Sequence, residues 1–377
     1  MKKIIIISHE YLPVRSGGVI LLNEIIQFLL KKKFKIKLIT SNYKQQRKLK
    51  QSKNLEVIGV NCLADNLGSS SLISLVLFFF NGLFKLIKMD KDGYERVFSL
   101  FIVPSGLIGY IASVLFGYKS YIFVGGADLY TTRSKFSKIL LILKPFTKFI
   151  VKKANKVFVA EGLENEYNRI YELYDFIKIR NGSSTKFKFN QLRKKKENYN
   201  FLIVGRLVER KGFFIILRAL TLLERKYLNK ITFTIIGNGP ELNKINDFIK
   251  NNDLSNNVKV INGIDHKDLK KYYINSDIYF FPSFPEGNSL ALIEAMSYNL
   301  PIVISNEKGN VELFDDNGWL IDIRDKVKVH ERMKKIIMEI LNTSSKRLKT
   351  LGNHSKKVSL KYDWSEILPI YEKEFSK

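Results

Sequence analysis

The amino-acid sequence predicts an α/β protein of two domains, each built on a parallel sheet flanked by helices. The first observation is length, since 377 residues exceed what a single hydrophobic core usually holds. The second is pattern: short apolar runs alternate with amphipathic stretches from end to end, which is typical of helix-covered parallel sheets. Apolar residues make up 45% of the chain, enough for two buried cores.

The N-terminal half opens with a predicted buried strand, Ile4–Ser8, then a loop with adjacent glycines and a predicted helix, Gly17–Leu30. Two further apolar segments, Leu72–Phe84 and Ile102–Tyr118, fall short of about 18 uncharged apolar residues, so we expect core or membrane-surface helices there. The other strands of this half are predicted at Ile36–Thr40, Leu55–Val60, Arg96–Leu100, Ser120–Val124, Val157–Ala160 and Ile177–Ile179.

The C-terminal half repeats the alternation. Strands are predicted at Asn200–Val204, Ile231–Ile236, Val258–Ile261, Ile278–Phe281, Ile302–Ile304 and Trp319–Ile321, and helices at Phe213–Glu224, Glu241–Asn251, His266–Asn275, Leu290–Tyr298 and Val327–Leu341. Residues 184–199 contain a run of basic residues and little periodicity, which is typical of a solvated linker. We therefore expect an N-terminal domain over residues 1–183 and a C-terminal domain over residues 200–361.

Positive charge is concentrated in the N-terminal half. Residues 1–196 hold 35 Lys and Arg against 13 Asp and Glu, a net +22, whereas residues 197–377 hold 28 against 23, a net +5. Such a field favours an anionic partner such as a membrane surface or nucleic acid, although a general bias toward Lys, Asn and Ile also explains it. Aromatic residues do not alternate with the basic ones, which disfavours nucleic acid. The lone Cys62 excludes a disulfide framework and fits a reducing cytoplasm.

The most informative motif is FPSFPEGNSLALIEAMSYNLPIV at residues 281–303. A buried strand ends at its start, a glycine-containing turn follows, and a helix opens near Ser289. A helix N-terminus directly after a strand presents free N–H groups and a positive dipole end, which suit phosphate. Glu286 in the turn and Glu294 on the second helical turn lie eight positions apart, so we expect a ligand site at this strand end.

A second motif, IVGRLVERKG at residues 203–212, also follows a predicted strand. Its Arg206 and Lys211 stand at a strand–loop–helix junction, where two cations can offset the charge of a departing diphosphate. In the N-terminal half, Gly17 and Gly18 permit close approach of backbone to a ligand, although an ordinary strand–helix turn explains them equally well.

The two glutamates resemble the E-x7-E signature of retaining glycosyltransferases of sequence family 4, and residues 205–212 are similar to that family's G-R-x-x-x-x-K-G string. The resemblance implies the GT-B fold, two Rossmann-like domains with parallel sheets facing a central cleft. It also implies that Glu286 faces the donor sugar, that Glu294 binds ribose hydroxyls, and that Arg206 and Lys211 hold the donor's diphosphate.

Further similarities extend over nearly the whole chain. By resemblance the remaining donor-binding positions are Asn288, Ser289, Leu290, Gly17, Gly18, Gly237 and Ile264. Asp128, in Gly125-Gly126-Ala127-Asp128, fits a Gly-x-Asp variant of the family and would position the acceptor or act as general base, with His9 at the first strand end as a weaker candidate. Residues 362–377, which include Trp364, resemble the last helix of the family, which crosses back to the first domain.

We therefore expect a retaining glycosyltransferase of the hexosyltransferase type, without cofactor or metal, since the D-x-D at Asp90–Asp92 is more typical of a surface turn. It would move a sugar from a nucleotide-diphosphate donor to a lipid-linked or polysaccharide acceptor in bacterial surface-glycan synthesis, of lipopolysaccharide, capsule or O-antigen type. We expect it in the cytoplasm, peripherally bound to the inner membrane face. A nucleotide-sugar 2-epimerase on the same fold and a basic nucleic-acid binder are the alternatives. The sequence leaves the sugar, the acceptor and the oligomeric state open.

Overall fold

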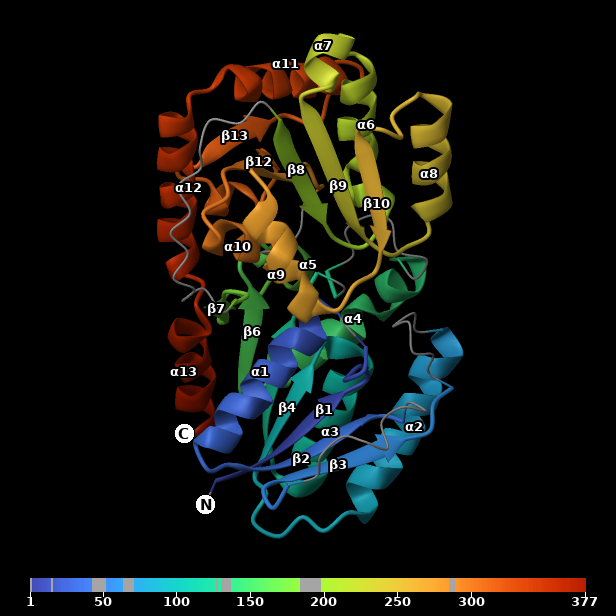
Figure 1. Cartoon of the computed structure of the whole chain (residues 1–377). Coiled ribbons are helices and arrows are strands. Elements are labelled where there is room, and N and C mark those ends of the chain that lie inside the picture. Colours follow the sequence, from blue (N-terminus) through green and yellow to red (C-terminus); the bar gives the residue numbers. More distant parts are fainter. Residues whose placement is uncertain are drawn as a thin grey trace. The chain divides into compact units, whose positions relative to one another are not determined.

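The computed structural model describes residues 2–14, 16–42, 52–63, 71–126, 128–129, 137–183, 198–284 and 289–377. The chain divides into two compact units (Figure 1). Unit 1 comprises Met1–Asn181 and Trp364–Lys377, and unit 2 comprises Gly182–Asp363. The expected linker, residues 184–199, falls outside the described residues except for its last two.

Unit 1 contains a wholly parallel sheet with the strand order β3-β2-β1-β4-β5-β6-β7. Each strand coincides with a predicted apolar run. The bounds are β1 Lys3–Ser8, β2 Lys35–Ser41, β3 Leu55–Val60, β4 Arg96–Leu100, β5 Lys119–Val124, β6 Lys156–Ala160 and β7 Ile177–Ile179. The chain runs outward in one direction from β1 and in the other from β4, so the topological switch point lies between these two strands.

The helices of unit 1 flank this sheet (Figure 1). They are α1 Gly17–Lys31, α2 Leu72–Lys88, the π-helical turn η2 Ile102–Gly106, α3 Leu107–Phe116, α4 Ser137–Lys153, α5 Glu164–Tyr171 and α13 Trp364–Phe375. The segment Ile102–Tyr118, expected to be one helix, thus begins with an irregular turn. Phe101 just before it has φ +70°, and Asp128 accepts a hydrogen bond from the N–H of Ile102, which together hold the chain out of α-helical geometry.

The C-terminal helix α13 belongs to unit 1, as the resemblance implied. Its Tyr371 and Phe375 are fully buried, and their rings contact Phe158 of β6 and Phe98 of β4 at centroid distances of 4.6 and 5.2 Å. Lys32, directly after α1, forms an ion pair of 3.1 Å with Glu372. These large buried rings help to hold the helix on the sheet.

Unit 2 contains a second parallel sheet, in the order β10-β9-β8-β11-β12-β13, with its switch point between β8 and β11. Its strands are β8 Tyr199–Val204, β9 Ile231–Gly237, β10 Val258–Asn262, β11 Ile278–Phe281, β12 Ile302–Ser305 and β13 Gly318–Ile321. Its helices are η3 Glu209–Lys211, α6 Phe213–Thr221, α7 Arg225–Leu228, α8 Leu242–Asn251, α9 His266–Asn275, α10 Leu290–Ser297, η4 Val311–Leu313, α11 Val329–Asn342 and α12 Ser345–Leu360. One buried cluster joins the sheet to α6, α8 and α11, and a second joins it to α9 and α10.

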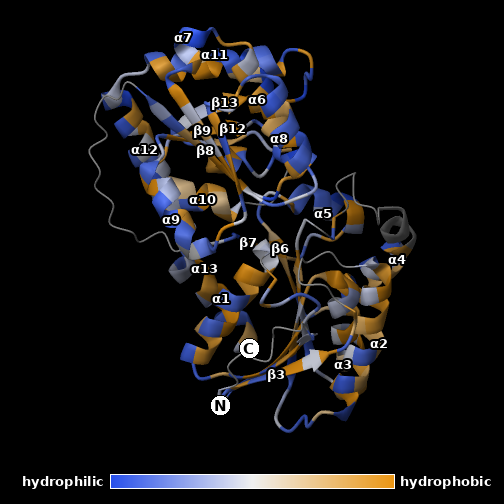
Figure 2. Ribbon diagram, turned by 45° about the vertical axis from the view of Figure 1, so that its right-hand side comes forward, coloured by the Kyte–Doolittle hydropathy of each residue, from blue (hydrophilic) through white to orange (hydrophobic). Residues whose placement is uncertain are grey.

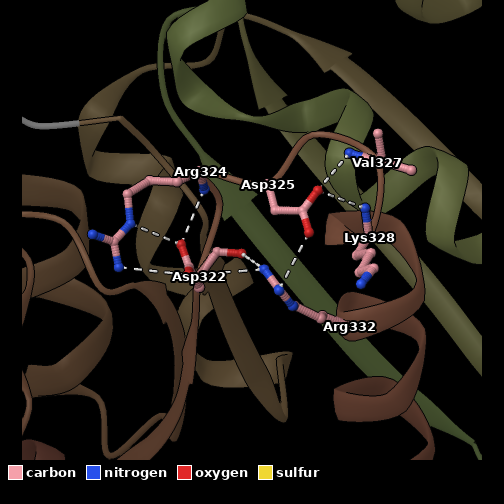
Figure 3. A network of polar contacts seen from close by, with 6 residues as sticks. All are labelled: Asp322, Arg324, Asp325, Val327, Lys328 and Arg332. Carbon is pink, nitrogen blue, oxygen red and sulfur yellow. Dashed lines mark hydrogen bonds and ion pairs between the residues drawn. The ribbon is translucent and has the colours of Figure 1, made fainter.

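Several helices of unit 2 differ from expectation: α6 ends three residues early, α7 was not predicted, and α11 and α12 differ as follows. The helix expected from Val327 begins at Val329 because the Asp325 carboxylate accepts hydrogen bonds from the N–H groups of Val327 and Lys328, while Arg332 donates to Asp325 and to the carbonyl of Asp322 (Figure 3). Helix α12 was not predicted, since its sequence is largely polar. It packs closely because of Gly352, where a Cβ would lie 2.2 Å from the carbonyl oxygen of Asn299.

Candidate functional site

The best-formed candidate site in unit 2 lies at the carboxyl ends of β8 and β11. The two strands pair in parallel through Phe201 and Leu202, so the loops that follow them leave the same edge of the sheet side by side. One loop carries Arg206 and Lys211, and the other leads to α10. In open parallel sheets, ligands bind at this kind of switch point, outside the carboxyl ends of the strands.

The two loops are held in direct contact by backbone groups. The N–H of Phe284 donates to the carbonyl of Arg210 at 2.9 Å. Gly212 has φ +72°, and a Cβ at this position would lie 2.2 Å from the carbonyl oxygen of Pro282. Only glycine satisfies both the left-handed backbone and the close approach, so the glycine of the second motif fixes how the two loops meet.

The two cations of the second motif have different environments. The side chain of Lys211 is buried, with its ammonium 4.6 Å from the ring centroid of Phe281, the last residue of β11. Arg206 is exposed. Lys211 is thus a fixed positive charge over an aromatic face at the switch point, and Arg206 is a longer, adaptable donor at its edge.

The loop after β9 packs onto the loop after β8. A Cβ at Gly237 would lie 1.8 Å from the carbonyl oxygen of Gly205, and the N–H of Leu207 donates to the carbonyl of Asn238 at 2.9 Å. The N–H of Gly263 in turn donates to the carbonyl of Gly237 at 3.2 Å, which brings the half-buried Ile264 to the same edge. The structure therefore groups Gly237 and Ile264 with the two cations.

Helix α10 contributes its N-terminus. Ser289, in extended conformation, precedes the helix, and its carbonyl accepts the first bonds, from the N–H groups of Leu292 and Ile293 at 3.1 Å each. The N–H groups before these, including that of Leu290, have no acceptor within the helix and lie at its positive dipole end. Glu286 and Asn288 fall outside the described residues.

Glu294 is held by two side chains that the sequence did not single out. Its Oε1 lies 2.6 Å from Nε2 of His266, and its Oε2 accepts a hydrogen bond of 3.1 Å from the hydroxyl of Tyr273. Burial, together with the charge of Glu294, raises the pKa of Tyr273, so the phenol stays a donor. Both partners come from α9, where a separation of seven positions places them on one face of the helix. This spacing is visible in the sequence, but it indicates a shared contact only once α9 is known to lie beside α10.

In unit 1, Asp128 is buried and both of its carboxylate oxygens are used. Oδ1 accepts from the N–H of Ile102 at 2.9 Å, and Oδ2 accepts from the N–H of Gly125 at 3.0 Å. Burial raises the pKa of Asp128 to about 7, although these hydrogen bonds act in the opposite direction. The described geometry is that of a residue that ties two strand-end loops together.

Of the two glycines expected near a ligand in unit 1, Gly18 lies against an aromatic ring, as does Gly125. A Cβ at Gly18 would lie 2.8 Å from Cζ of Phe101, and one at Gly125 would lie 2.9 Å from its Cε1. Gly17 begins α1 and follows Ser16, whose hydroxyl accepts from the N–H of Val19. Gly18 therefore makes room for Phe101, which stands at the end of β4.

His9, directly after β1, is buried and its Nε2 lies 3.2 Å from Oγ of Ser74 on α2. Burial lowers its pKa to about 4, so the ring is neutral at pH 7. Asp90 and Asp92 lie at a turn after α2 where their side chains are largely exposed. Within the described ranges, no three His, Cys, Asp or Glu side chains cluster closely enough to hold a metal ion.

Comparison with known proteins agrees with this architecture. Residues 184–357 match the family model described as glycosyl transferases group 1. The capsular polysaccharide biosynthesis glycosyltransferase CapM of Staphylococcus aureus is 25% identical, with 96% of each chain covered. The amylovoran biosynthesis glycosyltransferase AmsK of Erwinia amylovora is 34% identical over 32% of this chain and 31% of its own. The chain spans less than half the length of several relatives it matches.

Two solved structures share the fold along the entire chain. Sucrose-phosphate synthase from Thermosynechococcus elongatus superposes with a TM-score of 0.81 at 18% identity, and Anabaena HepE in complex with UDP-glucose with 0.74 at 16%; in both cases 100% of each chain is covered. Residues 184–357 are therefore similar to the glycosyl transferases of group 1, and the two parallel-sheet units have the GT-B fold of the structural neighbours.

Proposed function

We propose that the protein moves a sugar, with retention of anomeric configuration, from a nucleoside diphosphate donor to a lipid-linked or polysaccharide acceptor in surface-glycan synthesis. The observation that carries the proposal is the contact of the Lys211 loop with Pro282 and Phe284, which lead from β11 toward α10, at the β8–β11 switch point. A diphosphate needs fixed positive charge and free N–H donors at one place, and this edge of the sheet offers both.

In the proposed reaction the bond between the anomeric carbon and the diphosphate oxygen breaks, and a bond from that carbon to the acceptor oxygen forms on the same face. The acceptor proton leaves with the diphosphate. Arg206, Lys211 and the amides of Ser289 and Leu290 offset the charge that grows on the leaving group, where preorganised donors act most strongly. Glu286 would orient the sugar.

Glu294 would bind the ribose hydroxyls of the donor. The contacts with His266 and Tyr273 support this role because they fix the carboxylate before a ligand arrives, and a preorganised acceptor loses less entropy on binding. Gly237 and Ile264 would border the nucleobase and phosphate, and Gly17 and Gly18 would lie near the donor phosphate and the acceptor.

The positive charge at this edge leads us to propose that no metal or cofactor is required. We also propose that the acceptor is reached at the inner face of the cytoplasmic membrane, since the N-terminal half carries a net +22. None of the helices among the described residues combines the length and apolar character needed to cross a bilayer. CapM acts, by its name, in capsule synthesis, which supports a surface glycan as the product class.

The test is a panel of uridine and guanosine diphosphate sugars, assayed for release of nucleoside diphosphate with and without EDTA. UDP-glucose is the first donor to try, because HepE was solved with it. We expect turnover of at least one donor, undiminished by EDTA, and NMR of the product should show the anomeric configuration of the donor. Loss of activity with EDTA or an inverted product would contradict the proposal.

The same panel addresses the alternatives. A 2-epimerase would convert a donor into its C2 epimer without acceptor and without a new glycosidic bond. A nucleic-acid binder would turn over no donor and would bind duplex DNA with an affinity that falls steeply as salt rises. Either outcome would replace the transferase proposal.

A further inference from the structure

Helix α2 of unit 1 has two apolar faces, and only one of them is buried. Ser74, Phe78, Gly82 and Leu86 recur every four residues and are buried. The other face consists of Ile73, Val76, Phe80, Phe84 and Ile87, which we call the α2 stripe. Their spacing of three and four residues places them on one side of the helix. Phe80 is 62% exposed and Ile73 65%, so this stripe is a continuous apolar surface facing solvent.

The stripe continues onto the neighbouring helices. Val114 and Leu115 on α3 and Phe146 and Phe149 on α4 are also exposed, and the ring of Phe149 meets Tyr110 of α3 at a centroid distance of 5.5 Å. Hydrophobic colour runs along α2 and α3 in Figure 2. Of the 17 exposed large hydrophobic residues in the described part of the chain, ten lie on α2, α3 and α4, including all four phenylalanines. Patches of this extent mark an interaction surface.

The charged residues on the three helices that carry this surface all have one sign. The sequences of α2, α3 and α4 contain no Asp or Glu, whereas lysines close α2 and α4. The ammonium of Lys88 lies 4.3 Å from the ring centroid of Phe84, and that of Lys153 lies 5.9 Å from that of Phe149. Aromatic side chains bordered by lysines, on helices without acids, match the boundary between acyl chains and anionic headgroups. A second copy of the chain would instead set lysines against lysines.

The buried face of α2 connects this surface to the edge of the sheet where ligands bind. Ser74 on the first turn lies 3.2 Å from Nε2 of His9, directly after β1, and the ring of Phe78 meets the His9 ring edge-on at 5.1 Å. The first turns of α2 therefore lie beside the carboxyl end of β1, from which the loop to Gly17 departs. A lipid-linked acceptor held at a bilayer under α2 would lie near this strand end.

We propose that the α2 stripe, with the exposed residues of α3 and α4, docks unit 1 on an anionic lipid bilayer, with α2 lying in the interface. The proposal rests on the proposed function, since it assigns the membrane that presents the acceptor to one surface of the chain. It adds that contact is made by apolar insertion as well as by charge.

The test is co-sedimentation of the full chain with phosphatidylcholine vesicles, with and without phosphatidylglycerol. We expect binding only when phosphatidylglycerol is present. The double variant Phe80→Glu, Phe84→Glu should bind at least about tenfold more weakly, because two apolar insertions are lost. Lys85→Gln, Lys88→Gln keeps the apolar stripe and should lose about fivefold per lysine. The matched control is Val327→Glu, Leu360→Glu, which places the same charges on exposed aliphatic positions of unit 2 and should bind like wild type.

Donor hydrolysis without vesicles, circular dichroism and light scattering complete the experiment. The Phe80→Glu, Phe84→Glu variant should keep the fold and the hydrolysis rate of wild type. Vesicle binding equal to wild type in both the glutamate and the lysine variants would overturn the proposed docking surface. A wild-type protein that is a dimer, together with a glutamate variant that is a monomer, would overturn it as well. A wild type that hydrolyses no donor, while the variants still lose vesicle binding, would contradict the proposed function and leave the docking surface standing.

Discussion

The two units share one architecture and differ in what they place at the carboxyl ends of their strands. In unit 2, the loops at the strand ends pack together at Gly212 and Gly237, which lie close to the backbone of a neighbouring loop. The charged side chains of Lys211 and Glu294 lie at the same edge of the sheet. Unit 1 fills the corresponding edge with the ring of Phe101 and buries Asp128 beneath it. The surfaces differ as well, since all exposed phenylalanines of the described residues lie on unit 1.

Under the proposed function, this contrast indicates how the two units would divide the work of a transferase. A diphosphate is small and constant, so the loops that would bind it are tightly specified by backbone contacts and charge. A glycan or lipid acceptor is large, and unit 1 offers a broad apolar and basic surface in place of a compact charged site. Substitutions in both units test whether this division holds.

The largest loss of catalytic rate is expected on replacing Lys211. Replacing it with Met removes the buried charge beside β11, and loss of one such group typically costs about 10²–10³-fold in kcat, or about 3–4 kcal/mol. Lys226→Met on α7 is the control, because it removes an exposed lysine of the same unit. Steady-state kinetics with the best donor measure both. Equal rates for the two variants would remove Lys211 from the diphosphate site.

The next effect is on stability. Gly237→Ala forces a Cβ to 1.8 Å from the carbonyl oxygen of Gly205, so backbone must move, and overpacking of this kind costs about 1–3 kcal/mol or more. Gly126→Ala in unit 1 is the comparison, since its Cβ would meet nothing nearer than 4.0 Å. Thermal unfolding should show a lower midpoint for the first variant and no change for the second. If both were tolerated, the tight specification of the unit 2 loops would be wrong.

Replacement of Asp128 should cause a smaller change in stability, and one that depends on pH. Its folded pKa of about 7 exceeds its ordinary value of 3.8, so between these values the folded state keeps a proton that the unfolded state has released. This contribution to stability is therefore present below about pH 4 and is lost as pH rises toward 7, by up to about 1.4 kcal/mol per pH unit. Asp128→Asn cannot ionise, so its stability deficit relative to wild type should shrink from pH 5 to pH 7.5 in urea titrations.

His9 provides the matched control, because its contribution to stability should change with pH in the opposite direction. Its folded pKa of about 4 lies below the ordinary 6.5, so the unfolded state holds the extra proton between these values and stability rises with pH. The deficit of His9→Gln should therefore grow from pH 4.5 to 6.5, opposite to that of Asp128→Asn. Parallel trends in the two variants would show that neither buried group titrates as described.

The smallest effect is expected at the surface of unit 2. Arg332→Ala removes the guanidinium that joins the loop after β13 to α11 (Figure 3). The side chains are about one third exposed, and Asp325 still accepts hydrogen bonds from the N–H groups of Val327 and Lys328 in the turn before the helix. We expect no resolvable change in the thermal midpoint or in donor turnover, because exposed ion pairs contribute little. A drop comparable to that of Gly237→Ala would mean that this network, rather than the glycine contacts, organises unit 2.

Sequence by itself determined the strands, the helices with clear apolar periodicity and the main candidate motifs. Buried parallel strands read as short apolar runs, a local property, so β1 and β11 were both located from their own residues. Arg206, Lys211 and Glu294 were likewise placed near strand ends, because each lies in the loop or the helix that follows a predicted strand.

Tertiary structure alone decided which of these pieces meet. The pairing of Glu294 with His266 and Tyr273 depends on α9 lying beside α10, and α12 forms where it does because Gly352 allows contact with Asn299. The exposure of the α2 stripe could not be predicted from the sequence either. Both faces of that helix are apolar, and only packing against the rest of unit 1 determines which face is buried. Contacts between distant segments depend on strand order, which local patterns of residues do not encode.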